Sequence, residues 1–277
     1  MALWLLHDPP VLDERVRPAG AFELSWSLHP SVLIGTALLA ALYFWGIGPA
    51  RRRWSLGPPA SPWRVLAFVL SSVVLLVSLN GPIHDLSDYY LFWVHMVQHL
   101  LLTLVWPQLL IASLPDWLLR PLVARPGVLP VWRFLTRPLV AGILFTVTIA
   151  FWHTIRFYDL MMRVHEVHVV THLMFMGAAI LLWWPVMSPL KEAPPLSMGF
   201  RMLYIFLVSL PMQLVAALIT FADSVLYPWY ADAPRTFGLD VQNDQLLGAL
   251  LMWIPGNLYM FGAIGIVFFL WAREEKA

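Results

Sequence analysis

Long apolar stretches separated by short polar segments follow one another along most of the chain. A bilayer core of about 30 Å needs about 20 mostly apolar residues per helix, with a tolerated range of about 17–25. Seven stretches meet this requirement, at residues 30–48, 63–80, 89–113, 138–154, 164–186, 200–222 and 245–271. The pattern therefore predicts an all-α integral membrane protein with seven transmembrane helices.

The segments between these stretches contain residues that end helices. Asn80-Gly81-Pro82 follows the second stretch, and a proline-containing segment from Pro115 to Arg137 follows the third. Glycine and proline beside polar residues mark turns and loops. We expect one seven-helix membrane domain over residues 30–271, an extracytoplasmic N-terminal segment over residues 1–29 and a cytoplasmic tail over residues 272–277.

The composition agrees with a membrane protein. Apolar residues (AVILMFWYC) make up 60% of the chain and charged residues only 12%, and the mean hydropathy is +0.73. An ordinary soluble domain is about 25% charged, so this chain has too few charges to cover a water-exposed surface. A net charge of +1 also argues against a nucleic-acid partner, which requires a concentrated basic face. We therefore expect membrane lipid to surround the helices.

The basic residues predict how the helices are oriented. Lysine and arginine near the ends of spans tend to remain in the cytoplasm. Twelve of the seventeen basic residues fall on one side of the predicted membrane, and twelve of the sixteen acidic residues fall on the other. We therefore expect the N-terminus outside and the C-terminus in the cytoplasm.

The chain contains no cysteine but nine histidines. The lack of thiols excludes disulfides, iron–sulfur clusters and cysteine-ligated zinc sites. All nine histidines fall in the predicted outer halves of the spans or in external segments. A bound metal would have to be held by His, Met, Asp or Glu, so these histidines are the first candidates.

Two predicted helices carry histidines at a spacing that places them on one face. His95 and His99 lie four residues apart in the third span. The fifth span carries three histidines, which fall within about 60° of one another when successive residues turn by about 100°. Imidazoles at such spacings can reach one ion. With one more histidine at the outer end of the fourth span, the predicted metal ligands are His95, His99, His153, His165, His168 and His172.

Several other side chains are candidates for auxiliary roles around these histidines. Helical periodicity places Asp88 on the face of His95, further outward, and places Asp244 at the outer start of the seventh span. Methionine fills gaps in cores more often than it binds metal, so the methionines are weaker candidates than the histidines. The auxiliary set is Asp88, Met96, Gln98, Met161, Met176 and Asp244.

The residues alone leave three interpretations of the cluster open: metal or cofactor ligation, hydrogen bonding between helices, and a proton path. Ionisable residues in lipid are costly and usually face a bundle interior, which favours a shared purpose. A cysteine-free site of His and Met fits copper best. Zinc hydrolysis is disfavoured because Val169 stands where the general base of an HExxH motif belongs. Haem ligated by two histidines, such as His99 and His172, is the competing cofactor.

A set of short motifs resembles one known family. They are His95-Met-Val-Gln98-His99-Leu-Leu-Leu102, Trp106-Pro107, Leu114-Pro115, Trp152-His153, Tyr158-Asp159, the stripe of His165, His168 and His172 ending in Trp183-Trp184-Pro185, and Asp244-Gln245-Leu-Leu-Gly248. They resemble the CtaG family of membrane-integral cytochrome c oxidase assembly factors, which are seven-span bacterial proteins. The resemblance covers about residues 30–270.

This resemblance implies a multi-pass protein of the bacterial plasma membrane that helps to mature a haem-copper oxidase. It implies delivery of copper to a cytochrome c oxidase subunit at the outer side, without catalysis by the chain itself. A homo-oligomer is compatible with the sequence. The alternatives are a haem-binding electron-transfer protein and an assembly scaffold without metal. The positions that match the family are His95, Gln98, His99, His153, His165, His168, His172 and Asp244.

Overall fold

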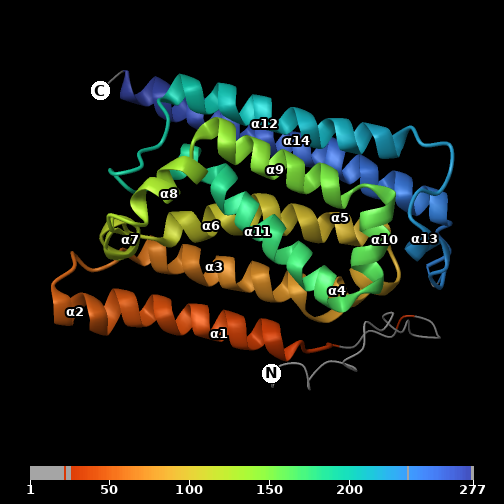
Figure 1. Ribbon diagram of the computed structural model, residues 1–277, viewed down its shortest axis with the longest axis horizontal. Helices are drawn as coiled ribbons and strands as arrows, with labels where there is room; N and C mark the ends of the chain where they lie inside the picture. Colours follow the sequence, from red (N-terminus) through yellow and green to blue (C-terminus); the bar gives the residue numbers. More distant parts are fainter. Residues whose placement is uncertain (1–21, 23–25, 236, 276–277) are drawn as a thin grey trace.

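The computed structural model describes Phe22, residues 26–235 and residues 237–275. Its long helices lie side by side along the longest axis of the molecule, and short helices cover the two ends (Figure 1). In chain order the elements are α1 (Pro30–Trp45), η2 (Gly46–Ala50), α2 (Arg51–Trp54), α3 (Pro62–Leu79), α4 (Gly81–Tyr89), α5 (Phe92–Leu100), η3 (Leu101–Val105), α6 (Trp106–Ser113), α7 (Asp116–Val123), α8 (Leu129–Leu135), α9 (Pro138–Trp152), α10 (Ile155–Arg163), α11 (His165–Met187), α12 (Met198–Thr220), α13 (Pro228–Ala231) and α14 (Val241–Glu274).

Six unbroken helical stretches in the described residues are long and apolar enough to cross a membrane. They are Pro30–Trp54, Pro62–Leu79, Phe92–Ser113, His165–Met187, Met198–Thr220 and Val241–Glu274. The pair α8 and α9, bent by 64°, makes a seventh span if it is counted as one. Each expected stretch thus corresponds to a helix or to this bent pair, which confirms a helical, multi-pass membrane protein. The orientation remains a prediction.

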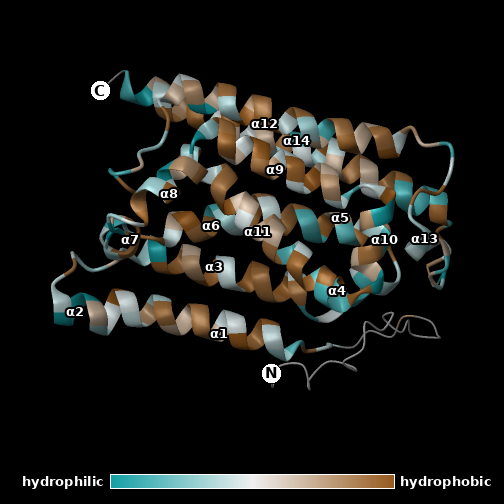
Figure 2. Ribbon diagram, viewed as in Figure 1, coloured by the Kyte–Doolittle hydropathy of each residue, from teal (hydrophilic) through white to brown (hydrophobic). Residues whose placement is uncertain are grey.

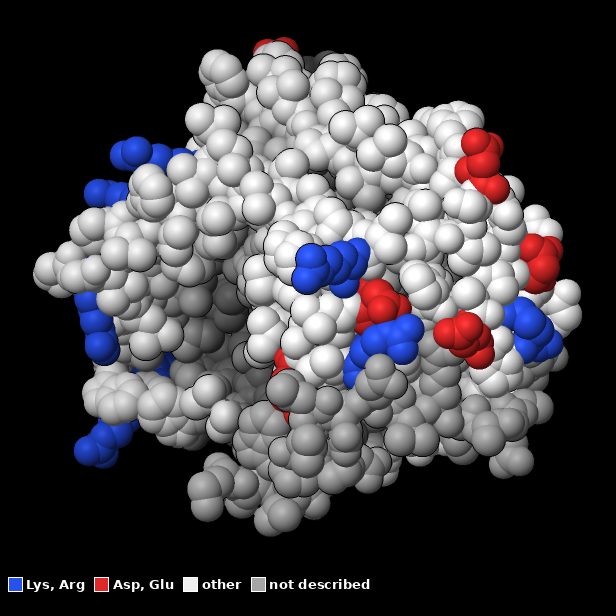
Figure 3. All heavy atoms as spheres, turned by 45° about the vertical axis from the view of Figure 1, so that its right-hand side comes forward, with Lys and Arg blue, Asp and Glu red and all other residues white. Residues whose placement is uncertain are grey.

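The polar and charged residues gather at the two ends of the bundle. Hydrophilic residues mark α2 at one end and α4 and α10 at the other, with largely apolar helices between them (Figure 2). Several basic side chains line the left edge of the view in Figure 3, and most acidic side chains lie in its middle and right, together with the other basic ones. Large exposed apolar side chains, such as Phe200 and Leu218, fit a surface that faces lipid.

A break that contains one extended residue separates each of the short helices α4 and α10 from the helix that follows. Leu91 is extended between α4 and α5, and Val164 is extended between α10 and α11. The Asp244 carboxylate accepts hydrogen bonds from the backbone N–H groups of Phe92 and Trp93, at 3.1 and 3.0 Å, so it caps a new helix at this point. The prediction that Asp88 extends the helical face of His95 is therefore wrong, because Asp88 belongs to α4.

The predicted methionine stripe is also divided between elements. Met161 lies in α10, whereas His165 begins α11 and Met176 lies further along α11. The extended residue Val164 separates the two helices, so a single helical face cannot include both methionines. The prediction that they extend the histidine stripe above and below on one helix is wrong.

A proline in the third span ties that span to α11. Pro107 cannot donate a backbone hydrogen bond to Thr103, four residues earlier. The Thr103 carbonyl instead accepts a hydrogen bond from the Trp183 indole N–H of α11 at 3.0 Å. The π-helical segment η3 lies immediately before this proline. This contact fixes the two histidine-bearing helices against each other below the histidines.

The turn between α3 and α4 holds the start of α1. Gly81 has a φ of +62°, which favours glycine, and the Trp26 ring lies against it. The Gly81 N–H donates to the Ser27 carbonyl at 2.9 Å, and the His29 N–H donates to the Asn80 side-chain oxygen at 2.8 Å. These bonds bring His29 beside α4.

Candidate functional site

Two pairs of histidines, one on α5 and one on α11, face each other between the two helices. His95 and His99, one turn apart on α5, have their Nε2 atoms 2.8 Å apart. His168 and His172 form the same arrangement on α11, with Nε2 atoms 2.7 Å apart. The ring of His95 lies 5.9 Å from that of His168 and 6.5 Å from that of His172, centre to centre. All four side chains are buried, so the spacing in the sequence does bring them together.

His153 adds a fifth ring to this group, which we call the histidine cluster: His95, His99, His153, His168 and His172. It follows the last residue of α9, and its ring lies 5.8 Å from that of His99. Its Nδ1 donates to the Ile149 carbonyl at 2.8 Å, which leaves a lone pair on Nε2. Among the described residues, neither this Nε2 nor the Nδ1 of His99 has a hydrogen-bond partner, although both are buried.

Tyr230 determines the tautomer of His95. Its hydroxyl donates to the Ser87 carbonyl and lies 3.0 Å from the Nδ1 of His95. Because a hydroxyl has one proton, it must accept at the histidine, so Nδ1 carries the hydrogen. The lone pair of His95 is then on Nε2, the atom that faces His99. Tyr230 of α13 thus directs the lone pair of His95 into the cluster, as the second partner of a ligating histidine does at metal sites.

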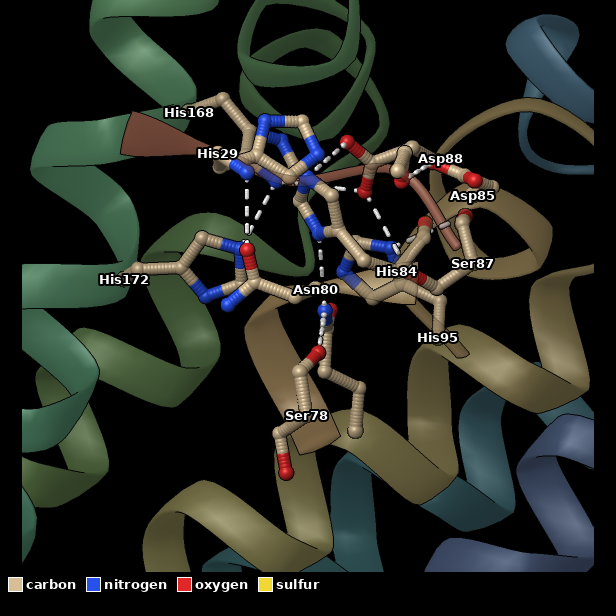
Figure 4. A network of polar contacts seen from close by, with 12 residues as sticks. His29, Ser78, Asn80, His84, Asp85, Ser87, Asp88, His95, His168 and His172 are labelled. Carbon is tan, nitrogen blue, oxygen red and sulfur yellow. Dashed lines mark hydrogen bonds and ion pairs between the residues drawn. The ribbon is translucent and has the colours of Figure 1, made fainter. Parts of the chain in front are cut away.

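A buried carboxylate lies at the edge of the cluster. Asp88 is fully buried, and its two oxygens lie 3.3 Å from the Nε2 of His84 and 3.4 Å from the Nε2 of His168. The Gln98 side-chain amide donates to the Ser78 carbonyl at 2.7 Å and lies 3.3 Å from the Nδ1 of His84 (Figure 4). Asp88 of α4 thus contacts the cluster at His168, and Gln98 of α5 lies beside it through its contact with His84.

Two histidines near the cluster were not among the predicted ligands. His84 contacts Asp88 from within α4, and the ring of His29 lies 4.3 Å from that of His84. The spacing of His84 and Asp88, four residues apart, was the available signal in the sequence. This spacing alone did not place His84 near the other histidines. The break between α4 and α5 does so, because it allows Asp88 of α4 to contact His168 of α11.

The other predicted residues lie around the cluster in several ways. His165 lines a cavity between α1 and α11 together with Met176. Met96 and Met161 are fully buried members of the apolar core. Asp244 caps α5 and pairs with Arg235 at 3.3 Å. These positions make Met96, Met161 and Asp244 structural supports of the elements that carry the histidines.

An aromatic segment closes the outer end of the cluster. Tyr227, Trp229 and Tyr230, at the start of and within α13, are each 1–2% exposed. The Tyr227 hydroxyl donates to the His153 carbonyl at 3.0 Å, and the Trp229 indole donates to the Asp88 carbonyl at 2.7 Å. Burial raises the pKa of the Tyr227 phenol and that of Tyr158 beside it, so both hydroxyls stay neutral.

The cluster is held together by its own hydrogen bonds. Within residues 26–235 and 237–275 and at Phe22, no group of three or more His, Asp or Glu side chains is arranged to hold a metal ion as it stands. Tetrahedral metal–nitrogen bonds of about 2.0–2.1 Å separate two nitrogens by about 3.3 Å. The two Nε2 pairs are closer together than this, at 2.8 and 2.7 Å, so ion binding would replace the proton that each pair shares and would require the rings to move apart.

Comparison with known proteins identifies the family. A family model described as cytochrome c oxidase caa3 assembly factor (Caa3_CtaG) matches residues 41–274. The chain belongs to this family. Neither a curated protein nor a solved structure matches the chain. The match confirms the resemblance that the histidine motifs indicated.

Membership of the caa3 assembly factor family places the protein among factors that assemble cytochrome c oxidase. The matched range begins within α1 and ends at the last residue of α14, so it includes the whole histidine cluster. The family description concerns assembly and not a chemical reaction, which agrees with the expectation of a non-catalytic role. It names no metal, so the ligand of the cluster has to be argued from its chemistry.

Proposed function

We propose that this protein binds copper at the histidine cluster and delivers it, at the outer side of a bacterial plasma membrane, to a subunit of the oxidase that it helps to assemble. The observation that carries the proposal is the pair of Nε2–Nε2 contacts, one on α5 and one on α11, whose buried rings lie next to each other inside the bundle. No reaction other than ligand exchange is required of the chain.

The donors of the described site suit a first-row transition metal ion such as copper. Imidazole suits copper, zinc and iron, and the described site offers imidazoles with one nearby carboxylate and no thiolate. The unpartnered ring nitrogens of His99 and His153 are costly in a buried place unless a ligand engages them. A cation bound there would remove this cost, whereas a purely structural hydrogen-bond cluster would leave it.

The number of histidines fits a carrier better than a permanent site. Neighbouring rings of the five imidazoles have centres 4.3–6.5 Å apart. Five such ligands are more than one Cu(I) ion requires at a time. An ion can then move between neighbouring pairs by exchanging one ligand before it releases the next. Such stepwise exchange permits transfer to a partner without a free ion in the membrane.

A metal analysis of three purified proteins tests the proposal. Wild type is expected to contain copper or to take it up on titration, whereas His99→Ala and His172→Ala are expected to lose most of it and to leave the oxidase without its copper centre. Gln213→Ala is the control. Gln213 lies outside the cluster, and its side-chain amide donates a hydrogen bond to Asn257 that joins α12 to α14.

Three results would contradict the proposal. Wild type that neither contains nor binds a transition metal would exclude copper carriage. A Soret absorption band in the isolated protein would favour haem as the ligand of the cluster. Normal oxidase copper content in cells that carry His99→Ala and His172→Ala would favour a scaffold without metal.

A further inference from the structure

The outer surface offers the cluster no direct opening among the described residues. His95 is fully buried, and the aromatic segment with Trp229 and Tyr230 lies over it. Tyr230 contacts His95 itself, and Phe92 packs on Tyr230 with ring centres 5.7 Å apart. A cation that entered from directly above would have to displace several packed aromatic rings.

A cavity of about 470 Å³ reaches the same cluster from the side, between α1, α3 and α11. One end of its lining consists of histidines, and the rest is mainly aliphatic. The histidines are His29, His84, His165, His168 and His172. The cavity opens at the side of the bundle, and it thereby connects the surface with the otherwise buried His168 and His172.

The polar part of this lining lies at the outer end of α1. His29 and Ser31 flank the first residue of α1, where the helix meets the external segment, and both line the cavity. The aliphatic part, with Leu39 and Ile180, lies deeper in the bundle. A cation that used the outer end would not cross hydrocarbon, where an isolated charge is costly.

We infer that a cation reaches the buried His95–His99 pair sideways, from the outer end of the cavity between α1 and α11 and past the contact of Asp88 with His84 and His168. The inference rests on the proposed function, since it describes how the same cluster is loaded. It assigns a transport role to His84 and Asp88, which would be positioning residues if the cluster were loaded from above.

The spacing of donor atoms supports this path. His29 and His84 have ring centres 4.3 Å apart at the outer end. Asp88 bridges the Nε2 atoms of His84 and His168 (Figure 4). The Nε2 of His168 lies 2.7 Å from that of His172. Each step is thus short enough for one donor to take over the ion before the previous one releases it.

The charge of Asp88 makes this path favourable for a cation. Asp88 is the carboxylate that contacts the histidines of the path, and it is fully buried. A charge in such a low-dielectric place acts strongly on an approaching ion. The neutral imidazoles alone would provide ligands but no long-range attraction.

Blocking the cavity without touching a histidine provides the main test. Gly35 lines the cavity and faces open space, so Gly35→Phe adds a ring there without a clash. The matched control is Ile34→Phe, because Ile34 is the neighbouring residue at the same depth, is 53% exposed and is absent from the cavity lining. The measurement is the rate of Cu(I) uptake by full-length protein in detergent, followed by stopped flow against a coloured Cu(I) chelator.

We expect Gly35→Phe to slow uptake by about tenfold or more with the same final copper content, and Ile34→Phe to match wild type. Asp88→Asn, which keeps the shape of the side chain but removes its charge, should slow uptake by about tenfold. Wild-type rates in both Gly35→Phe and Asp88→Asn would overturn the sideways path while copper binding stands. Failure of wild type to take up copper would overturn the proposed function and this path together.

A labelling experiment tests the cavity without any metal. Because the natural chain has no cysteine, Gly35→Cys and Ile34→Cys each introduce one thiol. A small water-soluble thiol reagent should label Gly35→Cys at least several-fold faster than Ile34→Cys, because a thiolate forms only in contact with water. Equal labelling rates would mean that the cavity excludes water, and the sideways path would be wrong.

Discussion

Tyr230 determines which nitrogen of His95 carries the hydrogen, and this role can be isolated by removing a single oxygen. Tyr230→Phe eliminates the partner of the His95 Nδ1 and leaves the Ser87 carbonyl, at 3.4 Å, as a weak substitute. Loss of such a second partner typically lowers metal affinity by about 10–100-fold. We expect a decrease of this size in the Cu(I) affinity of the variant, measured by competition with a chromophoric chelator.

Tyr227→Phe is the control for this substitution. Tyr227 is equally buried and lies in the same segment, but its hydroxyl bonds to the backbone carbonyl of His153 and to no ring nitrogen. Its affinity should remain near that of wild type. Nitrogen NMR of labelled histidine should show a change of tautomer at His95 in Tyr230→Phe only. Equal affinities and unchanged tautomers in the two variants would disprove the role of Tyr230.

At the scale of single residues, the sequence predicts histidines that depend on one helix and misses those that depend on a turn. The pairs on α5 and α11 follow from the four-residue spacing alone. His29 and His84 meet only because Gly81 turns the chain and Asn80 binds the backbone of His29. Periodicity describes neither contact, since both join residues from different elements.

At the scale of helices, Gly248 allows α14 to pack closely against α5. A Cβ atom at this position would lie 2.4 and 2.6 Å from ring atoms of Phe92 and 3.1 Å from the Trp93 Cα. Gly248→Val must therefore push α14 away from the start of α5. Overpacking of this kind costs about 1–3 kcal/mol. We expect a lower thermal unfolding midpoint in detergent, together with a loss of copper affinity, because Phe92 packs on Tyr230.

Gly262→Val provides the comparison on the same helix. A Cβ atom at Gly262 meets nothing within 4 Å, so valine there adds bulk without a clash. Small residues at helix contacts permit close approach in membranes, whereas those that face lipid are replaceable. This variant should unfold near the wild-type temperature. If Gly248→Val were as stable as Gly262→Val, the prediction that α14 packs too closely on α5 to admit a side chain at position 248 would be wrong.

The long helices were predictable from the sequence, and the short ones were not. Runs of about 20 apolar residues identify α3, α11, α12 and α14 with small errors at their ends. The short helices α4 and α10 contain charged residues and were merged into neighbouring spans or loops. The breaks that separate them from the long helices depend on tertiary contacts. Between α4 and α5, for example, Asp244 caps the start of α5 from more than 150 residues away. No local pattern can report such a contact.

At the scale of the whole molecule, the histidine cluster lies at the opposite end of the bundle from the basic run of α2. The cluster is near α4, α10 and α13, whereas Arg51 to Arg53 lie in α2 at the other end, the end at which the C-terminus also lies (Figure 1). Basic residues near span ends tend to stay in the cytoplasm. We therefore predict that the cluster faces the outer side, where the proposed copper carrier would have to release its ion.

Fusion reporters at the C-terminus test this orientation. A C-terminal green fluorescent protein should fluoresce, because that reporter folds in the cytoplasm, whereas a C-terminal alkaline phosphatase should be inactive. Reporters inserted after Asp223, in the segment between α12 and α13, should give the opposite pattern. Among the described residues between the two sites, α14 is the one helix long enough to span the bilayer. If the pattern were reversed, the histidine cluster would face the cytoplasm, and delivery of copper at the outer side would be impossible.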